Sequence, residues 1–136
     1  MDQEHNQRYA TDSYDRVGAE RLLGLLSTGV LLMQGPMGSM LSSELGAQDI
    51  PAAYWNVAEP QEVTRIHQQY ADAGAQVLLT NTFQATAPAL ERDHIESSVT
   101  MVCAEAVAAA HAAGGRNVVG VIGPCGIEWF HKDEPE

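Results

Sequence analysis

The chain of 136 residues is long enough for one domain with its own core, and 45% hydrophobic with 18% charged residues is typical of a protein that folds. Seven Lys and Arg residues stand against eighteen Asp and Glu residues, and the formal charge of -11 argues against binding to nucleic acids or anionic membrane surfaces. No apolar segment reaches the ~20 residues that span a bilayer, and the N-terminus lacks a signal-peptide pattern, so we expect a cytoplasmic protein.

The N-terminal residues 1–13 are polar and show no hydrophobic period, which predicts a mobile tail. Apolar residues then recur at helical spacing, so we expect a helix over residues 14–28. Asp12 or Ser13 is a suitable N-cap for this helix, and Gly29 is suited to its end.

Residues 30–33 form a short, continuous apolar segment, which is typical of a buried parallel strand. The turn over residues 34–39 contains Gly35 and Gly38, and glycines in such a turn let backbone amides approach a ligand closely. A short helix is expected from residue 39 to residue 45.

A connecting loop is expected over residues 46–58, followed by a helix that opens at Pro60 and stops at Gly74. A second strand, residues 76–79, follows within two residues. It gives way at residues 80–82 to side chains that both donate and accept hydrogen bonds. This change from apolar to polar side chains marks the strand end as a candidate binding position.

A third helix is predicted by the capping-box spacing of Asp93 and Glu96 and by apolar residues at helical intervals up to a stop at Gly114. Residues 117–122 then predict a third apolar strand. The final residues 127–136 predict a polar, solvated tail.

The alternation of strands and helices predicts one α/β domain over residues 14–126, with three parallel strands joined by right-handed crossovers. The C-terminal ends of parallel strands lie at the same edge of a sheet, and ligands of such folds bind there. The residues that follow the three strands are therefore the candidate binding site.

Five segments, taken together and in register, resemble the homocysteine-binding domain of cobalamin-dependent methionine synthases, betaine-homocysteine methyltransferases and homocysteine S-methyltransferases. These segments are residues 31–40, 59–63, 70–75, 79–83 and 120–124. The resemblance extends over roughly residues 25–126, and the Thr-Asn-Thr-Phe sequence at 80–83 is its most specific part.

The resemblance implies a (β/α)8 TIM barrel that holds homocysteine at the C-terminal mouth of its strands and transfers a methyl group to the homocysteine thiol, giving methionine. In this family zinc, held by three cysteines from late strands, keeps the substrate sulfur ionised. Neither Cys103 nor Cys125 falls at one of those ligand positions, so we assign no metal ligand and no catalytic residue to this chain. The methyl donor is not indicated by the sequence.

By position within the family pattern, the residues that grip the amino-acid end of homocysteine are Gln34, Gly35, Gly38, Asn81 and Thr82. The family usually has Asp where this chain has Gln34. A glutamine still forms hydrogen bonds, but it offers no negative charge to a substrate ammonium group.

Only the first three strands of the barrel are represented, so the expected fold is a partial TIM barrel with two open sheet edges. We therefore expect methyl transfer only if a complementary chain supplies the missing five strands. The alternative is a small non-catalytic α/β module that binds a ligand or a partner at Gln34, Asn81 and Thr82, or an inactive remnant.

The remaining chemically notable residues have structural interpretations. Cys103 and Cys125 are too few for a disulfide framework and are expected to be reduced thiols. His67 and His111 are interpreted as partly exposed surface or packing residues rather than bases, because their spacing implies no partner. The aromatic residues at 54–55 are expected to anchor their loop rather than to cover a pocket.

Overall fold

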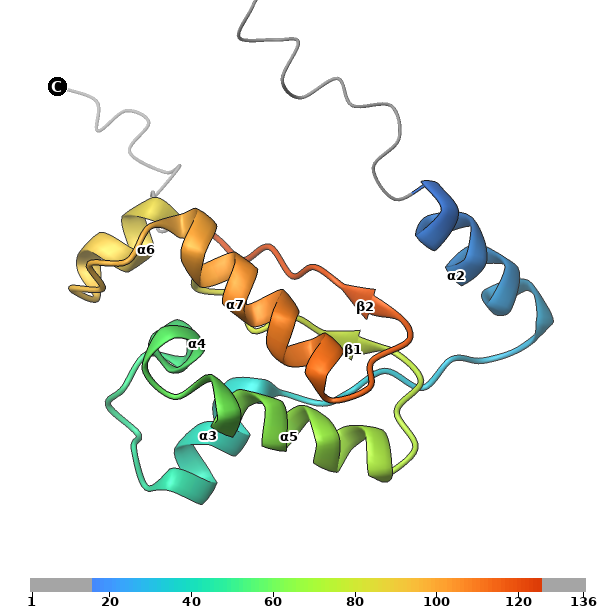
Figure 1. Cartoon of the computed structure of the whole chain (residues 1–136), viewed down its shortest axis with the longest axis horizontal. Coiled ribbons are helices and arrows are strands. Elements are labelled where there is room, and N and C mark those ends of the chain that lie inside the picture. Colours follow the sequence, from blue (N-terminus) through green and yellow to red (C-terminus); the bar gives the residue numbers. More distant parts are fainter. Residues whose placement is uncertain (1–15, 126–136) are drawn as a thin grey trace, which may run out of the picture. The chain divides into compact units, whose positions relative to one another are not determined.

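The computed structural model describes residues 16–125, and the expected tails at 1–13 and 127–136, like the expected N-cap at Asp12 or Ser13, lie outside this range. The chain divides into two compact units, Met1–Leu31 and Leu32–Glu136. Figure 1 labels the helices and strands of both units. Within the described residues, no helix is both long and apolar enough to cross a membrane.

The described part of the first unit contains helix α2, Arg16–Thr28, which ends where the sequence predicts. The hydroxyl groups of Ser27 and Thr28 donate to the carbonyl oxygens of Gly24 and Leu25 and complete its last turn. The segment after α2 is not the start of a buried strand, because Val30 is 94% exposed.

The sheet of the second unit contains two short parallel strands, β1 (Leu78–Leu79) and β2 (Val118–Val119). Leu78 lies opposite Val118, and Leu79 lies opposite Val119. The parallel pairing expected from the alternation of helices and strands is therefore confirmed.

The prediction of a third strand over residues 30–33 is wrong, because the segment is reduced to a single parallel bridge between Met33 and Val77. Short hydrogen bonds join this extended segment to the start of β1, from the Gln34 amide to the Val77 carbonyl (2.9 Å) and from the Gln76 amide to the Leu32 carbonyl (2.7 Å). Among the described residues this segment pairs only at Met33, so it forms an extended edge beside β1 rather than a regular strand.

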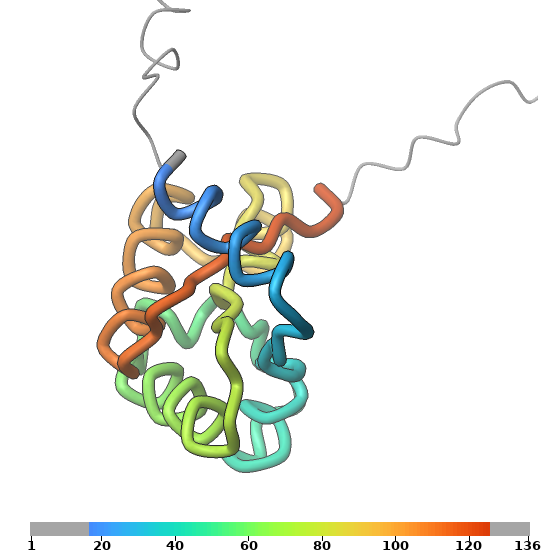
Figure 2. The backbone as a smooth tube through the Cα atoms, turned by 90° about the vertical axis from the view of Figure 1, so that its right-hand side faces the viewer, coloured from blue at the N-terminus to red at the C-terminus, as the bar shows by residue number. Residues whose placement is uncertain are grey.

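Two helices, α5 (Pro60–Asp72) and α7 (Val99–Ala112), pack side by side and cover one face of this sheet (Figures 1 and 2). The buried side chain of Leu78 reaches into this layer, where it contacts a cluster formed with Ala110 and Ala113. Helix α5 opens at Pro60 as predicted, and Gly74 with φ of 106° turns the chain out of it into the sheet.

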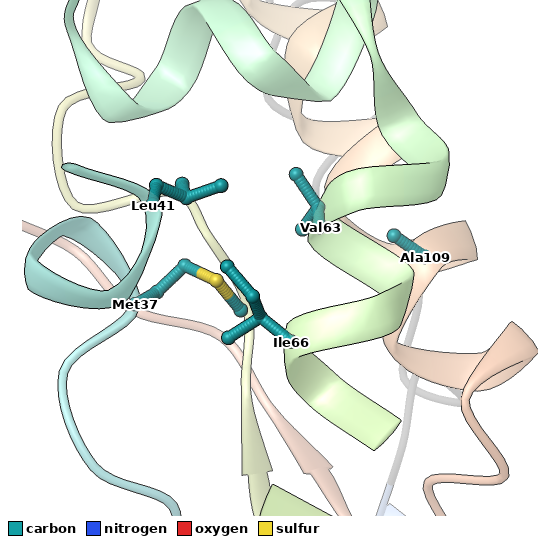
Figure 3. Close-up of a cluster of buried hydrophobic side chains, with 5 residues drawn as sticks. All are labelled: Met37, Leu41, Val63, Ile66 and Ala109. Atoms are coloured by element: carbon teal, nitrogen blue, oxygen red, sulfur yellow. The ribbon is translucent and has the colours of Figure 1, made fainter. Parts of the chain in front are cut away.

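Helix α3, Met37–Leu45, starts two residues earlier than expected and ends at Gly46, whose φ of 64° is left-handed. It docks on α5 and α7 through a buried apolar cluster drawn in Figure 3. The members of this cluster are Met37, Leu41, Val63, Ile66 and Ala109. The cluster fixes the start of α3 close to the strand ends, because Met37 is the first residue of the helix.

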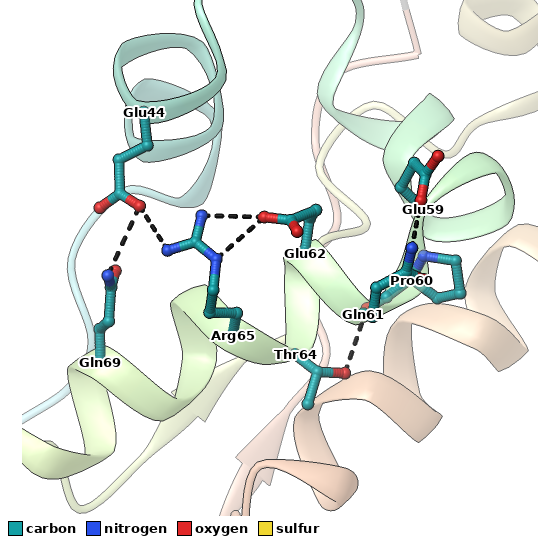
Figure 4. A network of polar contacts seen from close by, with 8 residues as sticks. All are labelled: Glu44, Glu59, Pro60, Gln61, Glu62, Thr64, Arg65 and Gln69. Carbon is teal, nitrogen blue, oxygen red and sulfur yellow. Dashed lines mark hydrogen bonds and ion pairs between the residues drawn. The ribbon is translucent and has the colours of Figure 1, made fainter.

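Polar contacts on the surface support the same docking of α3 against α5 (Figure 4). The guanidinium group of Arg65 on α5 contacts Glu44 on α3 at 2.6 Å and Glu62 on its own helix at 2.9 Å. These hydrogen bonds raise the pKa of Arg65 above its ordinary value. Exposed pairs of this kind stabilise a fold only slightly, so the apolar cluster carries most of the docking energy.

The expected loop over residues 46–58 contains a 3-10 turn, η1 (Ala52–Tyr54), and a short helix, α4 (Trp55–Ala58). Trp55 packs against the α3–α5 cluster, as the interpretation of an aromatic anchor predicts, whereas Tyr54 is exposed. Another short helix that the sequence reasoning missed, α6 (Ala87–Arg92), follows β1.

The predicted capping box of Asp93 and Glu96 is wrong. Asp93 follows the end of α6, where its carboxylate accepts from Arg92 at 2.8 Å. The N-cap of α7 is Ser98, whose hydroxyl accepts from the Met101 amide at 3.2 Å. The turn between the two helices is held by a second apolar cluster of Ala53, Ala85, Leu90, Ile95 and Val102.

Candidate functional site

A hollow of about 390 Å³ lies in the second unit where the first extended segment, β1 and the chain after β2 end. It is lined by residues 34–39, by Ala52, by residues 79–81 with Phe83 and Gln84, and by Val121. The C-terminal ends of the first extended segment and of the two strands therefore do meet at one place. Of the predicted site residues, Gln34, Gly35, Gly38 and Asn81 line the hollow, and Thr82 does not.

Gln34 is almost fully buried, with 7% of its surface exposed, and its side-chain oxygen accepts two hydrogen bonds. One comes from the backbone amide of Leu79 on β1 (2.9 Å), and the other involves Nδ1 of His67 on α5 (2.8 Å). The side-chain nitrogen of Gln34 contacts the Gly35 carbonyl at 3.4 Å, which is long for a hydrogen bond. The amide of Gln34 thus connects the turn to both the sheet and the helix layer.

His67 is completely buried on α5, so the surface interpretation is wrong, whereas its burial agrees with the alternative of a packing residue. Because the Gln34 oxygen can only accept, Nδ1 carries the proton and Nε2 is left with a lone pair, for which the described residues offer no partner. Burial lowers the pKa of His67 to about 4, and the ring is neutral at pH 7. The signal was present in the sequence, since His67 lies four residues after Val63 on the buried stripe of α5.

His111 occupies the last turn of α7 and is exposed, which agrees with its interpretation as a surface residue.

Asn81 is fixed by a reciprocal pair of amide contacts with Asn56, a fully buried residue of α4. Its Nδ2 donates to Oδ1 of Asn56 (2.9 Å) and to the Ala52 carbonyl (2.7 Å), while Nδ2 of Asn56 donates to the Asn81 carbonyl (2.7 Å). Both N–H groups of the Asn81 side chain are therefore occupied, and its Oδ1 remains as the acceptor of a lining residue. Sequence reasoning missed Asn56, because it placed that residue in a connecting loop without a binding role.

Thr82 closes a hydrogen-bonded ring that joins β1 to the segment after β2. The Val121 amide donates to the Thr80 hydroxyl (3.1 Å), and the Thr82 hydroxyl donates to the Val121 carbonyl (2.6 Å). The single proton of Thr82 is used in that bond, so the 2.7 Å contact between the two hydroxyls runs from Thr80 to Thr82. Thr82 shapes the wall of the hollow through Val121 and Thr80, both of which line it.

A side chain would meet different surroundings at Gly35 and at Gly38, the two glycines that line the hollow. A Cβ atom on Gly35 would lie 2.9 Å from the hydroxyl of Tyr70, which donates to the Pro36 carbonyl, so a larger residue would displace that ring. A Cβ atom on Gly38 would meet only the Ala52 side chain at 3.6 Å, an ordinary contact. Gly38 therefore leaves open space beside the start of α3.

The hollow contains hydrogen-bond donors but no charged side chain among the described residues that line it. The amides of Met37, Gly38 and Ser39 open α3 and have no partner within the helix, and its N-cap, Pro36, provides no side-chain cap. The start of a helix carries a partial positive charge that favours anionic groups. This side of the hollow is suited to a carboxylate.

The described residues do not fit the zinc site that the family resemblance implies. Across residues 16–125, no three His, Cys, Asp or Glu side chains are placed to share a metal ion. Cys103 packs against the second apolar cluster, where burial raises the pKa of its thiol, and it offers no thiolate to the hollow. Cys103 and Cys125 are both free thiols.

Comparisons with known proteins agree with this geometry. The profile of the family described as Homocysteine S-methyltransferase matches residues 31–131. The structure is similar to the crystal structure of the homocysteine methyltransferase MmuM from Escherichia coli in its metallated form, with a TM-score of 0.58 and 26% sequence identity. The match covers 76% of this chain but only 41% of the MmuM chain, so this chain spans less than half of that relative. Because the family profile matches most of its length, the chain belongs to the homocysteine S-methyltransferase family.

Proposed function

We propose that this chain is the N-terminal part of a homocysteine-binding barrel and that its hollow takes the amino-acid end of homocysteine. The single observation that carries the proposal is the convergence of Gln34, Gly38 and Asn81 on one hollow at the strand ends. Family membership supplies the class of ligand. The volume of about 390 Å³ is sufficient for a small amino acid.

The polar groups of the hollow match the two ends of an amino acid. The free amides at the start of α3 favour the carboxylate. Oδ1 of Asn81 is a neutral acceptor for the ammonium group, because both N–H groups of that side chain already have partners. Gly38 keeps the approach to these amides free of a side chain.

Methyl transfer to the homocysteine thiol, giving methionine, requires further strands in this proposal. The extended segment at residues 32–34 and β2 each have one neighbour among the described residues, which leaves both edges of the sheet open. Large apolar side chains are also exposed in this unit, including Leu32, Phe83 and Ile122. Unpaired edges and exposed apolar residues are what a complementary barrel segment would cover.

The catalytic metal and the methyl donor both fall outside what the described residues provide. Zinc serves in the resembling family to hold the substrate sulfur as a thiolate, and residues 16–125 contain no such site. This chain's own residues bind and orient the amino-acid end of the substrate. We place the protein in the cytoplasm, where its two thiols remain reduced.

Binding is tested by titrating L-homocysteine into the isotopically labelled full chain and following backbone amide resonances. We expect shifts confined to residues 34–39 and 79–81. Gly38→Val places a branched side chain in the open space of the hollow and should weaken binding at least tenfold. The matched control is Ser43→Val, an exposed position on the same helix with a similar change to a β-branched residue.

Methyl transfer is tested by supplying zinc and a methyl donor to the chain alone and to the chain mixed with the remaining strands of a relative. Turnover only in the mixture supports the incomplete barrel. Homocysteine binding without turnover in either sample would favour a non-catalytic binding module, and appreciable turnover by the chain alone would refute the requirement for further strands.

A further inference from the structure

The side-chain amide of Gln34 is held in one orientation by its surroundings. The backbone amide of Leu79 can only donate, so the atom that faces it at 2.9 Å must be the Gln34 oxygen. His67 adds a second donor to the same oxygen at 2.8 Å. Reversing the Gln34 amide would bring its NH2 group against both donors and leave two buried N–H groups without acceptors.

In this orientation the NH2 group of Gln34 faces neither the Leu79 amide nor His67. The hydrogen bond of this nitrogen to the Gly35 carbonyl is long, at 3.4 Å. The NH2 group can therefore still donate a stronger hydrogen bond to a ligand. Gln34 and Gly35 both line the hollow, beside the free amides that open α3. None of the described residues that line the hollow is acidic, so an ammonium group there would find no charged partner among them.

We propose that Gln34 is a specificity-determining residue that donates to the carboxylate of the bound amino acid, and that His67 is a positioning residue that holds the Gln34 amide in this orientation together with the Leu79 amide. The proposal rests on the proposed function and assigns the two ends of its ligand. The carboxylate binds between the Gln34 NH2 group and the start of α3, where donors converge. The ammonium group meets neutral acceptors only and contributes less to affinity.

His67 is suited to a fixed orienting role because it stays neutral and keeps a single N–H group. Its ring is fully buried in α5, and Nδ1 is the atom that faces Gln34. Protonation would add a second N–H group at Nε2, where the described residues offer no acceptor. The orientation of Gln34 is therefore maintained across the physiological pH range.

Two fragments of homocysteine allow the contribution of each end of the ligand to binding to be measured separately. The probe 4-sulfanylbutanoate keeps the carboxylate and lacks the ammonium group, and 3-sulfanylpropan-1-amine keeps the amine and lacks the carboxylate. Calorimetric titration of the full chain with L-homocysteine and with each probe gives three dissociation constants. We expect the carboxylate probe to bind at least tenfold more tightly than the amine probe, as a charge-assisted hydrogen bond set predicts.

Gln34→Glu replaces only the NH2 group by an oxygen, because the other oxygen still accepts from Leu79 and His67. This variant should bind the carboxylate probe at least tenfold more weakly and the amine probe more tightly than the unchanged chain does. His67→Phe keeps a buried ring but removes the N–H group, and it should reduce the preference between the probes. His67→Asn restores an amide N–H on the same γ-branch and should recover part of that preference, which a purely structural role of the ring would not do.

The outcomes separate the two levels of the proposal. If L-homocysteine itself fails to bind, the proposed function and this inference both fall. If L-homocysteine binds but the amine probe binds as tightly as the carboxylate probe, or if Gln34→Glu leaves their ratio unchanged, the inference alone is overturned. Retained preference in a folded His67→Phe variant overturns the positioning role of His67.

Discussion

The helix layer and the extended segments of the second unit differ in how far the chain completes them. In the helix layer, Val63 and Ile66 of α5 and Val102 of α7 are completely buried in apolar clusters. Elsewhere in the same unit Leu32, Phe83 and Ile122 remain 56%, 55% and 91% exposed. The helix layer is thus self-sufficient, whereas the extended segments carry apolar surface that the described residues of their own unit leave uncovered. A partial barrel can therefore fold around its helix layer and still present an unfinished sheet.

The largest expected effect on stability comes from a substitution in the buried helix layer. Ile66→Ala removes a fully buried side chain from the cluster between α3 and α5 and should lower the free energy of unfolding by about 2–5 kcal/mol. Leu32→Ala, at an exposed position, should change it by less than about 0.5 kcal/mol. Urea denaturation followed by circular dichroism measures both values. Equal losses of unfolding free energy in the two variants would contradict the contrast between the helix layer and the extended segments.

A second effect concerns the buried histidine of the helix layer. The pKa of His67 falls from 6.5 to about 4 on folding, so the unfolded chain takes up a proton first as the pH is lowered. Its contribution to stability is complete above pH 6.5 and is lost as the pH falls towards 4, by about 3 kcal/mol for a shift of this size. Denaturation of the chain and of His67→Gln at pH 7 and pH 5 isolates this contribution. A pH dependence that is identical in the two proteins would show that His67 is not responsible.

A smaller effect is expected where the helix layer meets the hollow. Asn56→Ala removes the buried partner of Asn81 and should cost about 1–3 kcal/mol, because it leaves polar groups of Asn81 unsatisfied. Homocysteine binding should weaken with it, since the orientation of Asn81 depends on these contacts. Thermal unfolding and the titration with L-homocysteine measure the two effects. The control is Gln48→Ala, which truncates an exposed amide side chain in the same connecting segment and should leave both quantities unchanged.

Local patterns in the sequence predicted much of the fold. The helical spacing after Pro60, the left-handed glycine at Gly74 and the end of α2 at Thr28 are all set by residues close together in the chain. The predicted capping box is wrong because two nearby positions, Asp93 and Ser98, both carry a side chain that can cap a helix. Helix α7 uses Ser98, and Asp93 follows the end of α6. The prediction of a strand at residues 30–33 failed because an apolar run does not show whether its backbone pairs: Met33 alone bridges to Val77, and Val30 is exposed.

The sequence by itself determined the family, the parallel order and four residues that line the hollow, because these follow from motif spacing and from the geometry of alternating strands and helices. Only the tertiary structure decided the roles of His67 and Asn56, each of which contacts a residue at least 25 positions away. It also decided the orientation of the Gln34 amide, whose oxygen accepts from Leu79 and His67. Hydrogen-bond orientation depends on which atoms from distant segments meet after packing, and no local pattern encodes that meeting.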